Sequence, residues 1–182
     1  MPDKDIKMPD AISLLKSDHR KVEDLFEQYE NTSNKRSKAK IAQEICLELA
    51  VHTAIEEEIF YPALKGKIED DVLDEAYVEH DGAKVLVAEL MAGTPEDMFY
   101  DAKVTVLSEE IKHHVKEEEQ RGGMFAQARK TDVDMDALGA QLAQRKKELQ
   151  KTYKTDGIPV PQTRSMKGTS LPAGSPVKYR AA

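Results

Sequence analysis

The sequence predicts an all-α protein: an up-down-up-down four-helix bundle with an additional C-terminal helix and a flexible tail. Apolar residues recur at helical spacing along most of the 182-residue chain, and no segment shows convincing strand alternation. Aromatic residues make up 5% of the chain, Trp is absent and 34% of the residues are charged, which suits a helical protein better than a β sandwich.

The chain divides into four parts by composition and periodicity. We expect a flexible N-terminus over residues 1–8, the bundle over 9–130 and the additional helix over 131–155. Residues 156–182 are expected to form the flexible tail, because from position 157 onward the chain has four prolines, three glycines and no acidic residue. Such a segment buries too little apolar surface to offset its ordering entropy.

The first two bundle helices are predicted over residues 10–31 and 35–61. Pro9 and Asp10 suit the first turn of the first helix, and the polar residues 31–34 end it. Pro62 is expected to stop or kink the second helix, because proline lacks the backbone N–H that an interior helical position requires.

The third helix is predicted over residues 71–91, closed by Gly93. Thr94-Pro95-Glu96-Asp97 reads as the N-cap, first position and acidic first turn of the fourth helix, which ends before Gly122-Gly123. A fifth helix over 134–153 has only a weak apolar stripe, so we expect it to pack on the outside of the bundle. The stripe consists of Leu138, Leu142 and Leu149.

Histidines interrupt the apolar stripe of each bundle helix. One lies on each stripe, and the second and fourth are followed four residues later by a glutamate. In chain order these residues are His19, His52, Glu56, His80, His114 and Glu118. In an up-down-up-down bundle with short loops, the two His-x-x-x-Glu pairs face each other near the depth of the other two histidines. Buried imidazoles and carboxylates are costly unless paired, and a metal centre satisfies all six most simply.

A plainer interpretation is available for each feature alone. A single core histidine is usually bonded to a neighbour, and a His–Glu pair four residues apart is often a surface interaction, so a metal-free structural bundle is the alternative. His113 with Glu117 has the same spacing as His114 with Glu118. The stripe favours His114, because Ile111 precedes it by three residues whereas Glu110 precedes His113. The neighbouring acidic residues, Glu57-Glu58 and those at 117 and 119, are interpreted as solvated charge.

Four segments resemble the hemerythrin-like family, the HHE cation-binding domain. They are SDHRKVEDLF around His19, HTAIEEEIFYPAL from His52, EAYVEHDGAKVL around His80 and IKHHVKEEE through His114, and the resemblance spans residues 10–128. It implies a four-helix bundle with a non-haem di-iron site bridged by carboxylates and an oxygen species. The four histidines on the stripes would be terminal ligands, and Glu56 and Glu118 would be the bridging carboxylates. Two iron ions are expected, although imidazole and carboxylate also suit manganese and zinc.

The sequence departs from the oxygen-carrying members of that family at one ligand. Those proteins have a fifth histidine four residues from another on the third helix, whereas Ala76 and Lys84 flank His80 at that spacing. Water, a tyrosine such as Tyr29 or Tyr100, or Glu23 would fill this position. An open position favours chemistry or sensing over reversible oxygen carriage.

Charge and composition narrow the functions expected. A net charge of −7 argues against nucleic acid as the main partner, and no apolar run approaches the length of a membrane helix. The N-terminus shows no secretory signal, and the single Cys46 favours a reducing compartment, so we expect a cytoplasmic protein.

The small ligand of the expected di-iron centre would be O2, peroxide or nitric oxide. An enzyme of this kind would be a di-iron peroxide-decomposing oxidoreductase; the alternative is an oxygen or iron sensor that signals through the C-terminal helix and tail.

Overall fold

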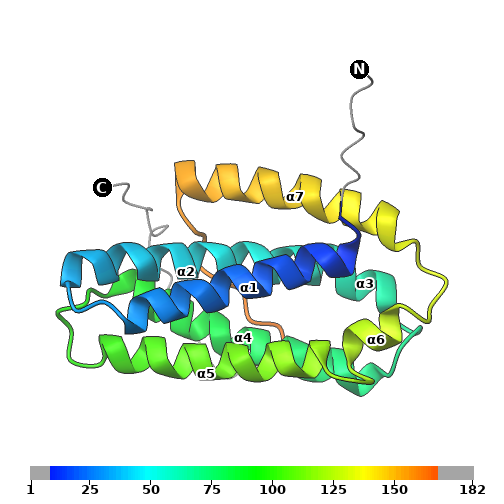
Figure 1. Cartoon of the computed structure of the whole chain (residues 1–182), viewed down its shortest axis with the longest axis horizontal. Helices are drawn as coiled ribbons and strands as arrows, with labels where there is room; N and C mark the ends of the chain where they lie inside the picture. The colour runs from blue at the N-terminus through cyan, green and yellow to red at the C-terminus, as the bar shows by residue number, and fades with distance from the viewer. Residues whose placement is uncertain (1–8, 168–182) are drawn as a thin grey trace.

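Four long helices form the body of the molecule in the computed structural model, which describes residues 9–167. They are α1 (Ala11–Glu30), α2 (Lys35–Ile55), α4 (Asp70–Ala92) and α5 (Tyr100–Glu119). Each of these helices runs antiparallel to the one before it (Figure 1). The predicted fold class is confirmed, while the segments at 1–8 and 168–182 lie outside the described residues. None of the helices in the described range is long and apolar enough to cross a membrane.

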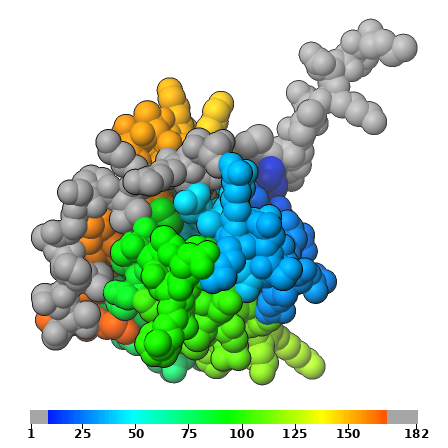
Figure 2. Space-filling model, turned by 90° about the vertical axis from the view of Figure 1, so that its left-hand side faces the viewer, coloured from blue at the N-terminus to red at the C-terminus, as the bar shows by residue number. Residues whose placement is uncertain are grey.

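The four helices close into a ring around one apolar core. Contacts join α1 to α2, α2 to α4, α4 to α5 and α5 back to α1. From the end of the bundle at which α1 turns into α2, these two helices lie beside α4 and α5 (Figure 2). The stripes predicted from spacing face inward, as Leu15, Ile45 and Leu107 show by being fully buried. The ring therefore points one face of every helix at a shared interior.

The second helix does not stop at Pro62. It passes through a π turn, η1 (Glu56–Phe60), and continues as α3 (Tyr61–Leu64). The backbone N–H of Tyr61 donates to the carbonyl of Glu56, five residues earlier, so one extra residue is accommodated just before the proline. This wider turn changes which side chains face the interior beyond Glu56.

The fourth helix begins at Tyr100, five residues after its predicted first position, Pro95. Residues 94–97 form a turn instead, in which the N–H of Asp97 donates to the carbonyl of Thr94 at 2.9 Å and the N–H of Thr94 donates to the Asp97 carboxylate at 2.7 Å. A short helix that the sequence analysis missed, α6 (Met124–Ala128), follows α5 and buries Met124 and Phe125 against the bundle.

The predicted fifth helix is present as α7 (Met135–Asp156) and packs outside the bundle against α1 and α2 (Figure 1). Asp134 caps it by accepting the N–H groups of Asp136 and Ala137. Its three stripe leucines are buried. Gly139 permits the close approach to α1, since a Cβ at this position would lie 2.5 Å from the carbonyl oxygen of Pro9.

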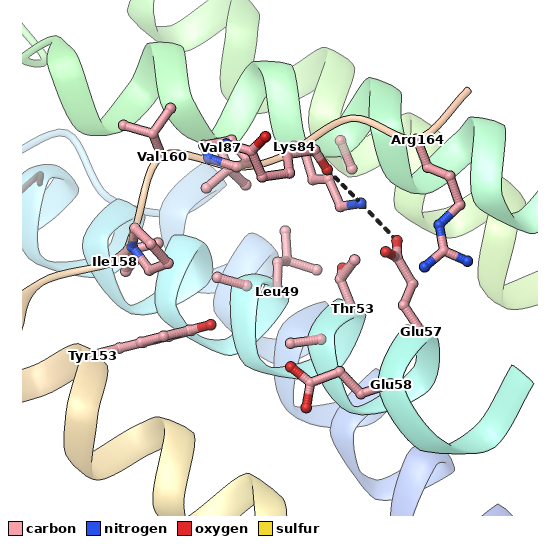
Figure 3. Close-up of a pocket in the computed structure, with 16 residues that line it drawn as sticks. Leu49, Thr53, Glu57, Glu58, Lys84, Val87, Tyr153, Ile158, Val160 and Arg164 are labelled. Carbon is pink, nitrogen blue, oxygen red and sulfur yellow. Dashed lines mark hydrogen bonds and ion pairs between the residues drawn. The ribbon is translucent and has the colours of Figure 1, made fainter. Parts of the chain in front are cut away.

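The first part of the predicted tail, residues 157–167, here called the strap, lies against the bundle, whereas residues 168–182 lie outside the described part of the chain. Ile158 is buried, and the carboxylate of Asp81 on α4, itself 0% exposed, holds the far end. One oxygen of Asp81 accepts the N–H groups of Arg164 at 2.8 Å and Ser165 at 2.6 Å, together with the Ser165 hydroxyl at 2.7 Å. These bonds fix a segment that has few apolar residues. The strap forms one wall of a cavity of about 340 Å³ between α2, α4 and α7 (Figure 3).

Candidate metal centre

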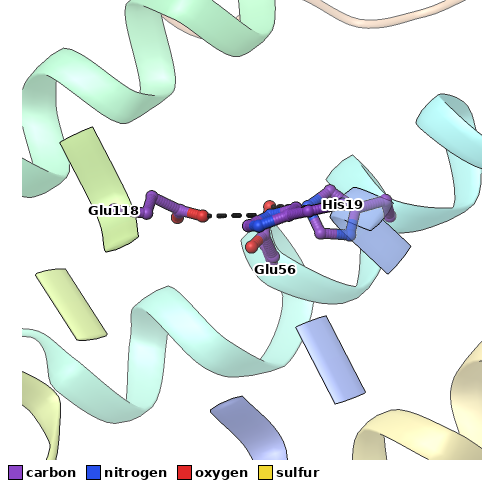
Figure 4. Close-up of side chains that lie close together, drawn as sticks. His19, Glu56 and Glu118 are labelled. Carbon is purple, nitrogen blue, oxygen red and sulfur yellow. Dashed lines mark hydrogen bonds and ion pairs between the residues drawn. The ribbon is translucent and has the colours of Figure 1, made fainter. Parts of the chain in front are cut away.

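The six residues singled out on the helical stripes converge inside the bundle. His19 lies on α1, His52 on α2 and His80 on α4. Glu56 is the first residue of the π turn, and His114 and Glu118 lie on α5. Every one of the six is at most 7% exposed. His19, Glu56 and Glu118 approach one another from three different helical segments in Figure 4.

The histidines form two pairs whose Nε2 atoms face each other. The Nε2 atoms lie 3.2 Å apart in the pair His19–His52 and 3.3 Å apart in the pair His80–His114. Such contacts place nitrogen lone pairs or protons against one another in a buried space. Both nitrogens of a pair could instead hold one cation, which would relieve this conflict.

The two glutamates connect the two histidine pairs. The Oε2 atom of Glu56 lies 3.1 Å from Nε2 of His52 and 3.3 Å from Nε2 of His80. Glu118 approaches the other two histidines, at 3.3 Å from His19 and 3.7 Å from His114. Each carboxylate therefore spans from one pair to the other, the arrangement that carboxylates bridging two metal ions require.

Buried oxygen atoms within the cluster lack hydrogen-bond partners. Oε1 of Glu56 and Oε2 of Glu118 have none among the described residues, although both side chains are at least 98% buried. An unsatisfied buried carboxylate oxygen is unfavourable by several kcal/mol, on the order of the loss of a hydrogen bond to a charged group. The donor set, four imidazoles and two carboxylates with free lone pairs, fits two closely spaced metal cations.

Each histidine of the cluster has a carboxylate near its outer nitrogen, supplied by the preceding helix of the ring. The distances from carboxylate oxygen to Nδ1 are Glu119–His19 2.7 Å, Asp18–His52 3.6 Å, Glu57–His80 3.1 Å and Glu79–His114 2.7 Å. At His19, His80 and His114 the hydrogen-bonded carboxylate keeps the proton on Nδ1 and turns the Nε2 lone pair inward, whereas Asp18 acts on His52 through its charge. The expectation that Glu57 and Glu119 are only solvated charge is wrong.

Tyr61, which the spacing of the stripes did not select, also lies beside His80. Its hydroxyl oxygen lies 3.2 Å from Nε2 of His80, 3.2 Å from Oε1 of Glu118 and 3.4 Å from Oε2 of Glu56. The ring is 1% exposed and stacks on the His80 imidazole. The structure thus adds a phenol to the six residues chosen from the sequence.

The π turn explains why spacing did not reveal Tyr61. In a regular α-helix, two residues five apart point about 140° away from each other. Five residues make a little more than one turn of a π helix, so Glu56 and Tyr61 both face the centre. A helical-stripe search with a fixed period places Tyr61 on the wrong face.

The three side chains considered from the sequence for the vacant ligand position lie elsewhere. The Tyr29 hydroxyl donates to Asp101 at 2.6 Å, and Glu23 pairs with Arg20 at 3.2 Å. Tyr100 packs at the start of α5, against Gly93. Lys84, which flanks His80 by four residues, pairs with Glu57 at 2.7 Å, so it contacts an outer carboxylate of the cluster.

His113 faces outward, and its side chain is 63% exposed. His114 is buried, as the apolar stripe of this helix indicates. The alternative register, with His113 in the core, therefore does not occur in the structure.

Opposite charges dominate the electrostatics of the metal-free cluster. Burial by itself lowers the pKa of His52, but Glu56 and Asp18 outweigh burial and raise that pKa to about 10. The pKa of His80 rises to about 9, because Glu56 and Glu57 outweigh the same burial effect. Burial and the neighbouring carboxylates hold the pKa of the Tyr61 phenol well above its ordinary value. Without metal, protonated imidazoles are the cations that balance the glutamates.

Comparison with solved structures supports the helical fold. A crystal structure of a hemerythrin HHE cation binding domain-containing protein, the Rv2633c homolog from Mycobacterium kansasii, matches with a TM-score of 0.69 and 22% identity, covering 82% of this chain and 95% of that chain. At this identity the likeness concerns the fold alone. A protein named DNA nickase from Nostoc sp. (strain PCC 7120 / SAG 25.82 / UTEX 2576) is 26% identical over 106 residues, which are 58% of this chain but 30% of that protein.

The family match covers the bundle itself. The profile of the hemerythrin HHE cation binding domain matches residues 10–128, a range that contains α1 to α6 and all six residues of the cluster. The matched range exceeds half of the chain. The chain therefore belongs to the hemerythrin HHE cation-binding domain family.

Proposed function

We propose that this protein is a non-haem di-iron protein that binds O2 or a related small oxidant, peroxide or nitric oxide. The observation that carries the proposal is the pairing of the ligands. Two buried His–His pairs are joined by two glutamates, each glutamate reaching from one pair to the other. This arrangement supplies nitrogen donors for two ions and oxygen bridges between them.

The ligands divide between the two ions by proximity. His19 and His52 would hold one ion, His80 and His114 the other, with Glu56 and Glu118 between them. Tyr61 would be a further ligand of the second ion, since its hydroxyl lies beside His80. When bound, a pair of iron ions supplies the electrons that reduction of an oxidant requires. Manganese and zinc suit the same donors, so the residues alone do not select iron.

The chain itself orients the ligands and limits what reaches them. The outer carboxylates hold the imidazole rings in one orientation, and the apolar core excludes bulk water. A space of about 10 Å³, near the lower limit for one water-sized molecule, lies among the four histidines. Leu49 and Thr53 line both this space and the larger cavity beneath the strap, so a small uncharged oxidant would reach the centre by passing between these side chains.

A sensor is the second candidate, because the strap is attached next to a residue of the cluster. Asp81, which holds the strap, directly follows His80 in α4. A change in the position of His80 on metal oxidation would therefore be transmitted to residues 157–167. A sensor would respond once to the oxidant, whereas an enzyme would consume it continuously.

Anaerobic reconstitution with ferrous iron, followed by addition of O2 or hydrogen peroxide, tests the proposal. We expect about two iron ions per chain and sustained loss of peroxide, in keeping with a two-metal site. A single oxidation without turnover, accompanied by altered trypsin cleavage of the strap, would indicate the sensor. Reversible spectral change with O2 would indicate a carrier.

Matched glutamate variants of α5 identify the site. Glu118→Gln should reduce iron binding, because it removes the charge of a buried carboxylate. Glu109→Gln, on the exposed face of the same helix, should bind iron as the unaltered protein does. Failure of the unaltered protein to bind iron would refute the proposal.

A further inference from the structure

A second cluster of metal-binding side chains lies outside the centre, on the outer face of α4 and α5. The Nε2 atom of His113 is 3.4 Å from Oε1 of Glu79 and 3.3 Å from Oε1 of Glu117. One ligand atom from each residue lies within 4.8 Å of the other two. The exposed fraction is 63% for the His113 side chain and 36% for that of Glu117, so an ion from solvent can reach both.

Glu79 belongs to this outer cluster and also contacts the centre. While its Oε1 faces His113, its Oε2 lies 2.7 Å from Nδ1 of His114. One carboxylate thus separates an exposed imidazole from a buried one. The outer cluster is therefore one side chain away from the centre.

An acidic cavity of about 340 Å³ adjoins Glu79 and Glu117 of the outer cluster. Five glutamates line it against one cationic side chain, Arg121; the glutamates are Glu69, Glu75, Glu79, Glu117 and Glu118. His114 and Glu118, both buried, form part of its wall. Oε2 of Glu118 has no hydrogen-bond partner among the described residues and only a 3.3 Å contact to His19. A cavity of this charge concentrates cations and excludes anions.

We propose that Glu79, His113 and Glu117 form a solvent-accessible site for a divalent transition-metal cation, and that the acidic cavity delivers this cation to His114 and Glu118. One imidazole and two carboxylates suit ferrous iron, manganese and zinc. Three protein ligands leave positions for water, so the site should hold its ion weakly and release it. The capture site stands on its own geometry, whereas delivery rests on the proposed di-metal function.

Equilibrium binding tests the capture site. The probe is Mn²⁺, whose free concentration is measured by electron paramagnetic resonance in the presence of full-length protein already loaded with ferric iron. We expect one additional Mn²⁺ per chain, lost in His113→Ala and in Glu117→Gln. Glu109→Gln makes the same charge change on the same helix and should keep the additional ion. Absence of that ion from the unaltered protein, or its retention in both site variants, would overturn the capture site and leave only ordinary surface ion pairs.

Loading kinetics test delivery. Metal-free protein is mixed anaerobically with ferrous iron, and the iron still accessible to a coloured chelator is measured over time. Loss of electrostatic focusing should slow entry about tenfold in the His113→Ala/Glu117→Gln double variant, with the final iron content unchanged. Equal loading rates in this variant, Glu109→Gln and the unaltered protein would refute delivery.

The two experiments separate the proposals. If the unaltered protein never retains iron against the chelator, the di-iron function fails, while Mn²⁺ binding to unloaded protein still reports on the capture site.

Discussion

Replacing Tyr61 with phenylalanine removes one oxygen atom from the centre and keeps the ring. The hydroxyl has three neighbours within 3.4 Å, whereas the ring remains buried and stacked on His80. In the metal-free protein, we expect Tyr61→Phe to lower the free energy of unfolding by about 1–2 kcal/mol, the range for a lost buried hydrogen bond. This corresponds to a decrease of about 2–8 °C in Tm for a protein of this size.

The loaded protein should respond more strongly to the same change. If the Tyr61 oxygen binds a ferric ion, the unaltered protein has a phenolate-to-iron charge-transfer absorption, and Tyr61→Phe abolishes it. Iron affinity should fall at least about tenfold, the lower end of the effect of removing a group that supports a metal site. Metal titration and visible spectroscopy measure both quantities on one sample.

Tyr77→Phe is the matched control for this experiment. The Tyr77 ring packs edge-on against the Tyr61 ring. Its substitution removes the same hydroxyl group from a ring that lies behind Tyr61 and not beside the histidines. We expect it to retain both the absorption and the affinity. If Tyr61→Phe also retained both, Tyr61 would be a packing residue, and the reasoning that assigns it as a metal ligand would be refuted.

Three further predictions address the surroundings of the centre. Glu57→Gln removes the charged acceptor beside His80 and should weaken metal binding by about 10–100-fold, while Glu58→Gln, which loses only a surface pair with Arg145, should not. Asp81→Asn should release the strap and speed trypsin cleavage after Arg164, whereas Asp74→Asn at an exposed position of the same helix should leave cleavage unchanged. Because the pKa values of His52 and His80 are raised to about 10 and about 9, metal binding displaces two protons, and calorimetry should show affinity for Zn²⁺ rising about 100-fold per pH unit between about pH 6 and 8. A pH-independent affinity would contradict the assignment of these imidazoles as ligands.

The same pKa shifts fix the sign of the stability change in the metal-free protein. A histidine whose pKa is raised by folding stabilises the fold fully below its unfolded pKa, near 6.5, and loses that contribution as pH rises through the folded value. The Tm of the metal-free protein should therefore fall from about pH 6.5 up to about pH 10. The loaded protein, whose imidazoles carry no extra proton, should show a smaller decrease.

Helical periodicity was sufficient to predict the bundle and to bring six buried polar residues together. It was sufficient because the four bundle helices are regular α-helices along their stripes. The second stripe is regular as far as Glu56, and the stripe of α5 is regular as far as Glu118. Each histidine replaces an apolar residue in a continuous stripe, so its inward direction follows from the spacing alone. His114 was separable from His113 for this reason.

Irregular backbone and contacts between distant segments explain what the sequence analysis missed. Tyr61 reaches the centre through a π turn, which a constant period of 3.6 residues does not describe. The outer carboxylates lie next to cluster residues in sequence but serve histidines on the following helix, so only the ring order of helices reveals their role. The strap is held mainly by one buried aspartate on α4, a contact that composition cannot indicate.

Anomalous diffraction at the iron absorption edge, from crystals of the reconstituted protein, tests the central claim most directly. We expect two peaks inside the bundle, one between His19 and His52 and the other between His80 and His114, with the Glu56 and Glu118 carboxylates spanning them. A single peak, or iron found only at the surface histidine, would contradict a di-iron centre built from these residues.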